Sequence, residues 1–578
     1  MAQIVETDVL VVGGGGAAAR AALEANREGV RVTMIMKGRF GESGATAYKV
    51  AETAGLQAAT GDDDPEDVPE GHYQDIMAAA QGMSDPRLSR ILAEEAPKAI
   101  RDLEKFGVSF LRDANGRYIR FRGCFSSRAL PPRGYLVKDH AHPIVVALKN
   151  QLSKTNVQIL EDTMLIKILV KDGNCLGAAV LDSQGNVLGI RAGAVVLGTG
   201  GAGGLFALNL NPPDVTGDGY VAAYRAGAEL ANMEFMQAGM GIVFPIKTLL
   251  HPWFFAPHPR LTNNRREEFM KNYVPDGWSV ESSFDVHSTH YPFTSAFPSK
   301  YINIGIKKEI LEGRGTPHHG VWADFSHLSE DKFIESLVKS GLNFAEEQWQ
   351  IKKAWCRNLG FDFLGQPFEV SLYGHAINGG VLINEQAESN IQGLFACGET
   401  AAGPHGADRL GGNMLITCQV FGSRAGKYAA LRSKEVKTEL PFDMVRKEES
   451  RLTSWQRKGR FQLPQIREAL QWTMWNNLLV VRSEEGITSS IKELERMESE
   501  QLPQTGIAGP KAVGEYLELM NLIQIGKIIA YAARERRESR GSHYREDFPN
   551  KKDDLNWDKT IIIRKNGEVI GSYFKKLG

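Results

Sequence analysis

Cysteine is scarce in this sequence, and the few cysteines are scattered. The 578 residues include five of them, Cys124, Cys175, Cys356, Cys397 and Cys418. None stands at the short spacing that a zinc or iron–sulfur site requires. We therefore expect packed core thiols, no metal, and no iron–sulfur cluster held by this chain itself.

Long apolar runs and an excess of one charge are missing as well. No apolar run approaches the roughly 20 residues of a membrane helix, and no charged-then-apolar leader opens the chain. The 68 Lys and Arg residues nearly balance the 69 Asp and Glu residues, which leaves no long-range field for nucleic acid or anionic lipid. We expect a cytoplasmic protein that neither binds nucleic acid nor inserts directly into a membrane.

A glycine-rich turn near the N-terminus stands between an expected strand and an expected helix. The strand is residues 8–12; Gly13, Gly15 and Ala18 follow at G-x-G-x-x-A spacing, and residues 20–28 continue as a helix. The first glycine permits a tight turn, the second lets backbone approach a pyrophosphate, and the alanine sets the helix–strand distance. The helix N-terminus attracts phosphate charge. The pattern predicts a dinucleotide-binding unit.

The second strand of this unit, residues 30–36, lacks its usual acid. Met36 followed by Lys37 stands where a carboxylate normally binds ribose hydroxyls. A degenerate unit that binds nothing is one interpretation. Residues 194–201 and 394–400 argue against it, because they resemble the second glycine strand and the glutamate-bearing strand of flavoproteins with two dinucleotide domains. The sequence therefore predicts FAD rather than NAD.

Several further segments share the pattern of one family. Residues 216–219, 225–229 and 233–237 match its approach to the active site, and residues 374–380 match its H-x-x-x-G-G segment. Residues 405–415 match the element that brings an arginine against a flavin ring, and residues 538–547 match its C-terminal region. The chain is therefore identified as a divergent member of the succinate dehydrogenase and fumarate reductase flavoprotein family, to which L-aspartate oxidase is related. The resemblance covers nearly the whole length.

The resemblance implies an α/β fold in three parts. A Rossmann-like FAD-binding domain, split in sequence, spans about residues 1–235 and 370–435, and an α+β capping domain is inserted at 236–369. A helical C-terminal domain spans 440–578 and ends in a β-hairpin. The sequence supports this last part on its own, because apolar residues recur at helical spacing and residues 559–574 alternate around an Asn-Gly pair.

The resemblance also assigns residues to FAD. A backbone group near Leu165 is expected at the adenine, and Glu399 at the ribityl or ribose hydroxyls. The family attaches its flavin through a histidine, but residues 43–46 contain none, so non-covalent FAD is expected. The expected set is Gly13, Gly15, Gly16, Ala18, Lys37, Gly44, Ala45, Thr46, Leu165, Thr199, Gly200, Asp218, His375, Glu399, Arg409, Asn413 and Leu415.

The substrate side departs from the family. Polar and cationic family positions are occupied here by Gly239, His251, Pro252, Phe255, Pro257 and residues 298–300. The family's cationic cage has thus become an aromatic run at residues 251–255, and we expect residues 253–255 to accommodate a larger or more apolar ligand. Phe255 stands where the family has its proton-relay arginine. If the segment around residues 251–260 is aligned differently, Arg260 or Arg265 serves in place of that arginine.

Half of the family's site is retained. His375 and Arg409 match the residues that bind one end of the substrate and stabilise the reduced flavin, and the planar fork of Arg409 suits a carboxylate or another oxyanion. The acid/base is left open among His251, Lys300 and four capping-domain histidines. These four are His287, His290, His318 and His319. No acid or cysteine stands at ligand spacing from them, so they are not expected to bind metal.

The sequence therefore predicts a flavin-dependent oxidoreductase with non-covalent FAD. We expect hydride transfer between flavin N5 and an oxyanion-bearing substrate, a carboxylate larger or more apolar than succinate or fumarate. A buried dicarboxylate that lacked its donors would cost several kcal/mol. By analogy, the complete C-terminal domain suggests that the partner is an iron–sulfur or other electron-transfer subunit, through which the protein could lie at a membrane periphery.

Three other functions stay open at this point. An aspartate-oxidase-like amino-acid oxidase would pass its electrons to oxygen. A true fumarate reductase or succinate dehydrogenase would need a displaced catalytic arginine at the flavin. A non-catalytic flavin electron-transfer subunit would bind FAD that no small molecule reduces. The sequence does not choose the substrate or the direction of the reaction.

Overall fold

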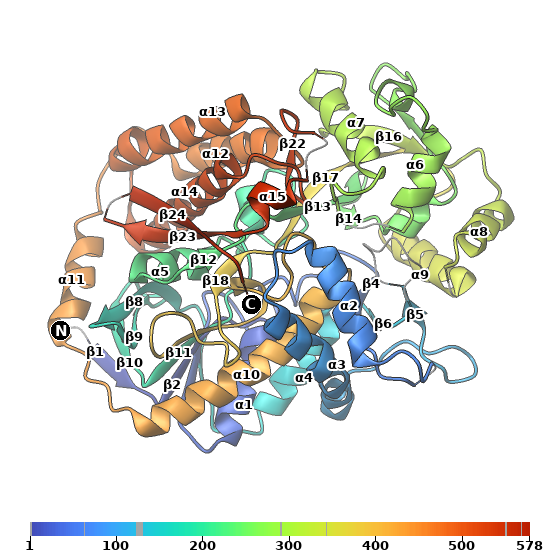
Figure 1. The fold of residues 1–578 in the computed structure, drawn as a ribbon. Coiled ribbons are helices and arrows are strands. Elements are labelled where there is room, and N and C mark those ends of the chain that lie inside the picture. The colour runs from blue at the N-terminus through green and yellow to red at the C-terminus, as the bar shows by residue number, and fades with distance from the viewer. Residues whose placement is uncertain are drawn as a thin grey trace.

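The structure, a computed structural model, describes residues 3–62, 64–122, 131–289, 292–342, 344–549, 552–567 and 569–577. Cys124 and His290, both named above, lie outside the described residues. Figure 1 shows the N-terminal part of the chain in blue at the bottom, the inserted segment in green at the upper right, and the C-terminal helices in orange and red at the upper left.

A five-stranded parallel sheet forms the dinucleotide-binding unit. Its strands, in spatial order, are β19 (Leu394–Ala396), β11 (Ala194–Leu197), β2 (Val9–Val12), β3 (Val32–Ile35) and β7 (Gln158–Leu160). Every residue of β2 is buried, as expected for a parallel strand covered on both faces. The following helix, α1 (Gly16–Arg27), begins four residues before the predicted start, because Ala17 to Ala19 are strong helix formers.

Helix α10 (Asn413–Glu435) packs along α1 (Figure 1). Two glycines make the close approach feasible. A Cβ added at Gly422 would lie 2.7 Å from the carbonyl oxygen of Ala17, and one at Gly426 would lie 2.1 Å from that of Ala21. Any larger side chain at these positions would push the helices apart.

Two further sheets complete the first part of the chain. One has the order β1 (Gln3–Glu6), β10 (Val187–Arg191), β9 (Asn174–Leu181) and β8 (Met164–Lys171). The other has the order β4 (Thr53–Gln57), β6 (Gly134–Lys138) and β5 (Arg120–Phe121). The helices of this part are α2 (Pro69–Ala80), α3 (Pro86–Phe106), α4 (His142–Leu152) and α5 (Asp218–Ala226).

The chain enters and leaves the capping segment through two paired strands, β13 (Met236–Phe244) and β17 (Phe368–Ile377). They lie at the centre of a sheet that also contains β14 (Thr248–Leu249), β15 (Arg260–Thr262) and β16 (Val321–Asp324). The helices of this segment are α6 (Val280–His287), α7 (Lys300–Leu311), α8 (Glu330–Lys339) and α9 (Ala345–Asn358). The expected boundaries near residues 235 and 370 fall at these two strands and stay a prediction.

The C-terminal region is helical, as its apolar spacing predicted. Its helices are α11 (Phe442–Thr453), α12 (Leu463–Leu478), α13 (Glu484–Arg496), α14 (Gly509–Glu535) and the short α15 (Asp554–Trp557). Its two short strands, β21 (Val481–Arg482) and β22 (Tyr544–Arg545), pair in parallel. Among the described residues, no helix has both the length and the apolar character to span a bilayer.

The terminal hairpin pairs with a strand of the FAD-binding part. It consists of β23 (Thr560–Asn566) and β24 (Val569–Lys575), and β23 pairs with β12 (Leu230–Ala231). The resulting sheet includes β18 (Gly380–Leu382) and β20 (Ala401–Ala402), so the hairpin extends a sheet of the FAD-binding part. Ile561, Ile562 and Ile563 are all fully buried, which requires that both faces of β23 be covered.

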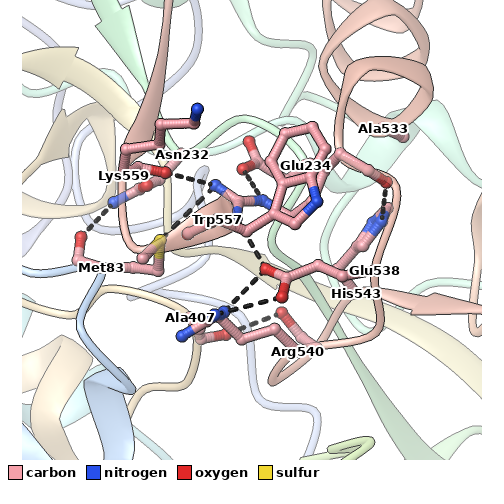
Figure 2. A network of polar contacts seen from close by, with 12 residues as sticks. Met83, Asn232, Glu234, Ala407, Ala533, Glu538, Arg540, His543, Trp557 and Lys559 are labelled. Atoms are coloured by element: carbon pink, nitrogen blue, oxygen red, sulfur yellow. Dashed lines mark hydrogen bonds and ion pairs between the residues drawn. The ribbon is translucent and has the colours of Figure 1, made fainter. Parts of the chain in front are cut away.

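A buried network of charged side chains joins the C-terminal region to the rest of the molecule (Figure 2). Nε of Arg536 donates to Glu234 at 2.7 Å and its Nη1 donates to Glu538 at 2.8 Å. Nε of Arg540 donates to the same Glu538 oxygen at 2.7 Å. All four side chains are fully buried. Of these three pairs, Arg536–Glu234 joins residues 302 positions apart, and it ties the C-terminal region to the segment that leads into the capping part.

His543 belongs to the same network in its neutral form. Burial and the nearby Arg482 and Arg536 hold the pKa of His543 well below its ordinary value. Its Nδ1 accepts from Arg482, which has only donors, so Nε2 carries the hydrogen and donates to the carbonyl oxygen of Arg536 at 3.1 Å. Arg482 also donates to the carbonyl oxygen of Glu234 at 2.6 Å.

We predict that Arg536→Met lowers the free energy of unfolding by about 3–5 kcal/mol, because it leaves Glu234 and Glu538 buried without their shared cation. Urea unfolding followed by circular dichroism measures the loss. Arg496→Met is the control: Arg496 pairs with Glu493 on the exposed side of α13, and its loss should cost under about 0.5 kcal/mol. Equal losses in the two variants would contradict the prediction.

Candidate active site

One cavity extends from the glycine-rich turn to the capping segment. It encloses about 1930 Å³ of space without protein atoms, part of it open to solvent. Gly13 to Gly16 and Leu165 line it from the FAD-binding part, and His251 to Trp253 line it from the capping segment.

All but two of the residues predicted to bind FAD line this cavity. They are Gly13, Gly15, Gly16, Lys37, Gly44, Ala45, Thr46, Leu165, Thr199, Gly200, Asp218, His375, Glu399, Arg409 and Leu415. Ala18 lies beneath them, where a Cβ added at Gly198 would approach its own Cβ to 2.9 Å, so it sets the packing distance between helix and sheet. The side chain of Asn413 turns inward, with Oδ1 3.1 Å from Nε2 of His72.

The turn before α1 fits a pyrophosphate. Gly13 has φ +122°, and a Cβ there would lie 2.2 Å from the carbonyl oxygen of Gly198, so only glycine is tolerated. Gly15 is the N-cap of α1 and no side chain caps this helix. The N–H of Gly16 donates to Oγ1 of Thr46 at 3.1 Å. The helix end therefore presents backbone donors and the positive end of its dipole to the cavity.

Lys37, which stands in place of the usual acid, is held by two carboxylates. Its Nζ lies 2.8 Å from Asp218 and 2.7 Å from Glu518, and it donates to Thr216 at 2.5 Å. Burial opposes the charge, but Asp218 and Glu518 outweigh it and raise the pKa of Lys37. Lys37 thus ties α14 to the FAD-binding part and brings the carboxylate of Asp218 to the cavity wall.

Glu399 has a raised pKa at the cavity wall. Burial raises the pKa of Glu399 to about 7, although the N–H of Ile377 and the charge of Arg409 act in the opposite direction. The Ile377 N–H donates to Oε1 at 3.0 Å. A ligand hydroxyl that donates to this carboxylate would favour its ionised form. Glu399 is therefore suited to hold a hydroxyl group of FAD.

Arg409 is buried and held in place from two sides. Its Nε donates to Oε1 of Gln237 at 3.1 Å, and Nε2 of Gln237 donates back to the carbonyl oxygen of Arg409 at 3.3 Å. Gln237 sits at a bulge in β13, where the pairing with β17 shifts, and such bulges re-aim side chains. Two residues before Arg409, the carbonyl oxygen of Ala407 accepts from Ser542 at 3.1 Å, so the C-terminal region anchors the loop.

His375 and His140 are neutral histidines in the cavity wall. Burial lowers the pKa of His375 to about 3, with Arg409 and His140 adding to the effect. Burial also lowers the pKa of His140 to about 4. His140 lies in a turn where Asp139 and His140 both have positive φ. At pH 7 the imidazoles can donate and accept hydrogen bonds without competing with Arg409 for an anion.

The aromatic run of the capping segment does not face the cavity as one surface. Residues Pro252–Phe255 form a 3-10 helix, and its side chains point about 120° apart because there are three residues per turn. Trp253 lines the cavity and stacks on His251, with ring centroids 4.3 Å apart. Phe254 and Phe255 pack inside the capping segment, so the expectation that all of residues 253–255 meet the substrate is wrong.

Phe254 and Phe255 fill the core of the capping segment instead. Phe254 packs against Phe363 with ring centroids 5.6 Å apart, and Phe255 meets the ring of His287 edge-on at 4.7 Å. Both phenylalanines are fully buried. The two rings therefore add stability to the segment and do not shape the cavity.

Lys300 does not line the cavity, which removes the geometric basis for its role in acid/base chemistry. It begins α7, and its Nζ lies 3.4 Å from the carbonyl oxygen of Ser295 and 6.0 Å from the ring centroid of Tyr544. The side chain of Lys300 therefore lies toward Tyr544 of the C-terminal region. Among the described histidines of the capping segment, His287, His318 and His319 are also absent from the lining.

These histidines have structural neighbours. Nδ1 of His318 lies 2.8 Å from Glu369, and the ring of His319 packs on Trp472. Within the described ranges, no group of three or more His, Cys, Asp or Glu side chains could hold a metal ion.

The lining contains one arginine among the residues that the structure describes. Arg409 and Lys37 are its two permanent cations, and Lys37 is already paired. Arg260 and Arg265, the alternatives for the missing arginine, are exposed to solvent and lie outside the lining. The described cavity therefore offers a single guanidinium to a substrate.

Sequence reasoning missed three residues beside the cavity. His140 lines it, and Glu52 and Lys352 form a buried ion pair of 3.1 Å behind His251. Glu52 and Lys352 are 300 positions apart, so no local spacing could have joined them. His140 is one of two histidines in a short polar turn, and nothing in that pattern separates it from a surface residue.

The geometry and the family comparisons agree on the class of protein, an FAD-dependent flavoprotein. Residues 8–415 match the model described as FAD binding domain, and residues 467–574 match the model described as Fumarate reductase flavoprotein C-term. The chain belongs to the flavoprotein family of succinate dehydrogenase, fumarate reductase and L-aspartate oxidase, and it is an FAD-dependent oxidoreductase.

Relatives and a solved structure match the chain over its whole length. It is 33% identical to one subunit of the CoM/CoB fumarate reductase of Methanothermobacter marburgensis, over 98% of both chains. It is 35% identical to an uncharacterized FAD-dependent oxidoreductase of Methanocaldococcus jannaschii, over 97% of this chain and 96% of the relative. Mycobacterium smegmatis Sdh1 has a similar fold, with a TM-score of 0.83 at 24% identity, over 100% of this chain and 95% of that chain.

We expect FAD to leave the protein on acid precipitation. Residues 43–46 contain no histidine, and their loop is pinned by a bond from the N–H of Gly44 to Asp214 at 2.8 Å. Yellow colour in the supernatant of acid-treated holoprotein is the expected result. Colour that stays in the washed pellet would contradict non-covalent binding.

We also expect FAD affinity to fall as the pH decreases through about 7, the pKa of Glu399. The ionised carboxylate accepts hydroxyl donors, so binding is strongest above pH 7 and weakens by up to about tenfold per pH unit below it. Quenching of FAD fluorescence on the apoprotein measures the dissociation constant. Glu399→Gln should abolish the pH step, and Glu435→Gln, on the exposed end of α10, should keep it. If FAD affinity in Glu399→Gln still falls as the pH decreases through about 7, Glu399 is not the group that governs binding.

Proposed function

We propose that this oxidoreductase transfers a hydride between bound FAD and an oxyanion-bearing substrate, a carboxylate larger or more apolar than succinate or fumarate. One observation carries the proposal: in the described lining, the permanent cations are Arg409 and Lys37, and Lys37 is bound by two carboxylates. The lining also contains the apolar side chains of Leu210, Leu249, Trp253 and Met414, together with imidazoles that are neutral at pH 7. This lining suits a substrate that has one anionic group and is otherwise apolar.

FAD, when bound, supplies the hydride acceptor or donor at its N5 atom. Arg409 binds the oxyanion of the substrate, and its bonds with Gln237 keep the guanidinium oriented. His375 adds a hydrogen bond without adding charge. Helix α10 begins at the cavity without a capping side chain, so its dipole favours negative charge near its first turn.

Trp253 contributes both surface and a donor. Its side chain is nine-tenths buried, and its indole Nε1 has no hydrogen-bond partner among the described residues. A buried donor that lacks a partner costs about 1–3 kcal/mol. A substrate atom that accepts from this N–H would recover that energy, which favours a polar group placed away from the carboxylate.

A dicarboxylate as small as succinate fits this site poorly. Its second carboxylate would be buried without a cation, at a cost of several kcal/mol. Each 1.4 kcal/mol weakens binding about tenfold. The same argument applies to aspartate, which also carries two carboxylates, and so it disfavours the aspartate-oxidase-like alternative.

Fumarate reduction is the second candidate. It is favoured by the 33% identity to the relative from the CoM/CoB fumarate reductase. That relative's name designates one subunit of an assembly, and it supports our proposal that the partner of this chain is an iron–sulfur or other electron-transfer subunit. A cytoplasmic location, with any contact to a membrane made through that partner, stays a prediction.

The test is an anaerobic titration of the FAD-loaded protein, followed at the visible flavin absorbance. We expect aryl or long-chain monocarboxylates to reduce the flavin, or their unsaturated forms to reoxidise it, and millimolar succinate and fumarate to do neither. Arg409→Gln should slow the reaction at least 100-fold, and Arg260→Gln, on the exposed face of the capping segment, should leave it unchanged. Rapid bleaching by succinate would contradict the proposal and favour fumarate or succinate chemistry.

A further inference from the structure

Three buried side chains stand in a row behind the capping end of the cavity. Nε2 of His251, which lines the cavity, lies 3.4 Å from Oε1 of Glu52. Oε2 of Glu52 lies 3.1 Å from Nζ of Lys352. Lys352 also donates to the carbonyl oxygen of Leu249 at 3.0 Å. Glu52 and Lys352 are almost completely removed from solvent.

The row crosses the boundary between two parts of the chain. Glu52 immediately precedes β4 of the FAD-binding part, and Lys352 lies on α9 of the capping segment. Their opposite charges balance, which is required because a buried charge without a partner costs several kcal/mol. The carboxylate is therefore held next to His251 only when the capping segment is in place.

The carboxylate determines which nitrogen of His251 carries hydrogen. An ionised carboxylate only accepts, and burial of Glu52 is outweighed by Lys352 and His251, which lower its pKa and keep it ionised. Nε2 lies 3.4 Å from Oε1 of Glu52 and 3.5 Å from Oγ1 of Thr53, so a hydrogen on Nε2 has an acceptor in either group, and Nδ1 is then the basic nitrogen. Stacking on Trp253, with ring planes 8° apart, fixes the plane of the imidazole.

The charges around His251 leave it neutral before substrate binds. Burial lowers the pKa of His251 to about 4; Glu52 raises it, whereas Lys352 and His140 lower it. These three are the titratable groups that face it from the residue before β4, from α9 and from the turn before α4. A neutral imidazole with a free basic nitrogen is the form that accepts a proton.

We propose that His251 exchanges a proton with the substrate and that Glu52, held by Lys352, is the positioning residue that sets its tautomer. This rests on the proposed function. In the oxidation direction, bound FAD would accept the hydride that leaves one C–H bond with its electron pair. The adjacent atom loses a proton to Nδ1 of His251, and the double bond forms between the two atoms. Glu52 then faces the imidazolium, and reduction follows the reverse course.

Other candidates for this role fit less well. His375 lies against Arg409 and serves the oxyanion end of the substrate. Lys300, His318 and His319 do not line the cavity. Of the acid/base candidates from the sequence that the structure describes, His251 alone combines a place in the lining with a buried carboxylate behind it.

The first arm of the test needs no substrate. Ring-labelled histidine NMR of the FAD-loaded protein reports the tautomer, and His251→Gln identifies the signal. We expect the Nε2–H form in the wild type and loss of that preference in Glu52→Gln. The double variant Glu52→Gln, Lys352→Met removes both charges and leaves no unpaired buried ion if the single variant fails to fold. Lys353→Met is the control, since Lys353 pairs with Glu330 at 2.5 Å. An unchanged tautomer in the Glu52 variants overturns the proposal.

The second arm measures the pH dependence of flavin reduction by an acid that reacts in the titration. In the wild type the rate should rise with pH as His251 becomes neutral. The rate of flavin reduction in His251→Gln should be lower by about 100-fold or more, and it should lose the rise with pH. In Glu52→Gln the rise in rate should occur at lower pH, because the carboxylate of Glu52 raises the pKa of His251. A purely structural role would lower the rate equally at every pH.

The two failures are distinguishable. If no acid reduces the flavin, the proposed function is contradicted, and the tautomer measurement still decides whether Glu52 governs His251. If an acid does reduce it and His251→Gln keeps the wild-type pH step, the proton-exchange role is overturned while the proposed function stands.

Discussion

Burial of Arg536 with its carboxylate partners is the interaction on which the rest of the molecule depends. Its guanidinium is fully buried between Glu234, which precedes the capping segment, and Glu538, which follows the last long helix. Without it, Glu234 would lose the cation that binds its buried carboxylate, and Glu538 would keep only Arg540. The network continues through Ser542 to the loop that carries Arg409. Arg409, a residue of the cavity wall, thus lies on a loop that the C-terminal region anchors.

The site divides its tasks between parts of the chain. Arg409 is oriented by Gln237 and by the anchored loop, at the junction of the FAD-binding part with the C-terminal region. Trp253 and His251 come from the capping segment, and so does the cation that holds Glu52. The residues around Arg409 and those around His251 therefore come from different parts of the chain and can be substituted independently. This explains how the chain keeps the fold of its family while its substrate side departs from it.

Local patterns were sufficient for the dinucleotide unit and insufficient for the substrate side. The strand, turn and helix around Gly13 follow one another in sequence, so spacing alone predicted them, with the helix start off by four residues because alanines extend it. The terminal hairpin was recognised, but its partner β12 lies more than 300 residues away and carries no local signal. Aromatic character at residues 253–255 was visible, but which ring meets the cavity depends on the 3-10 turn. The pairing of Glu52 with Lys352 exists only in three dimensions.

The packing of α1 on α10 fixes the spacing of two helix ends. Ala17 is level with Gly422 and Ala21 with Gly426, so the helices run in the same direction. Because α10 starts at Asn413, about eight residues before the point level with the start of α1, its N-terminus is displaced by about 12 Å at 1.5 Å per residue. The helices therefore act as a molecular ruler. Both helices begin at the cavity without a capping side chain, so the positive ends of two dipoles are held there at this offset, and the two glycines keep the helices in close contact.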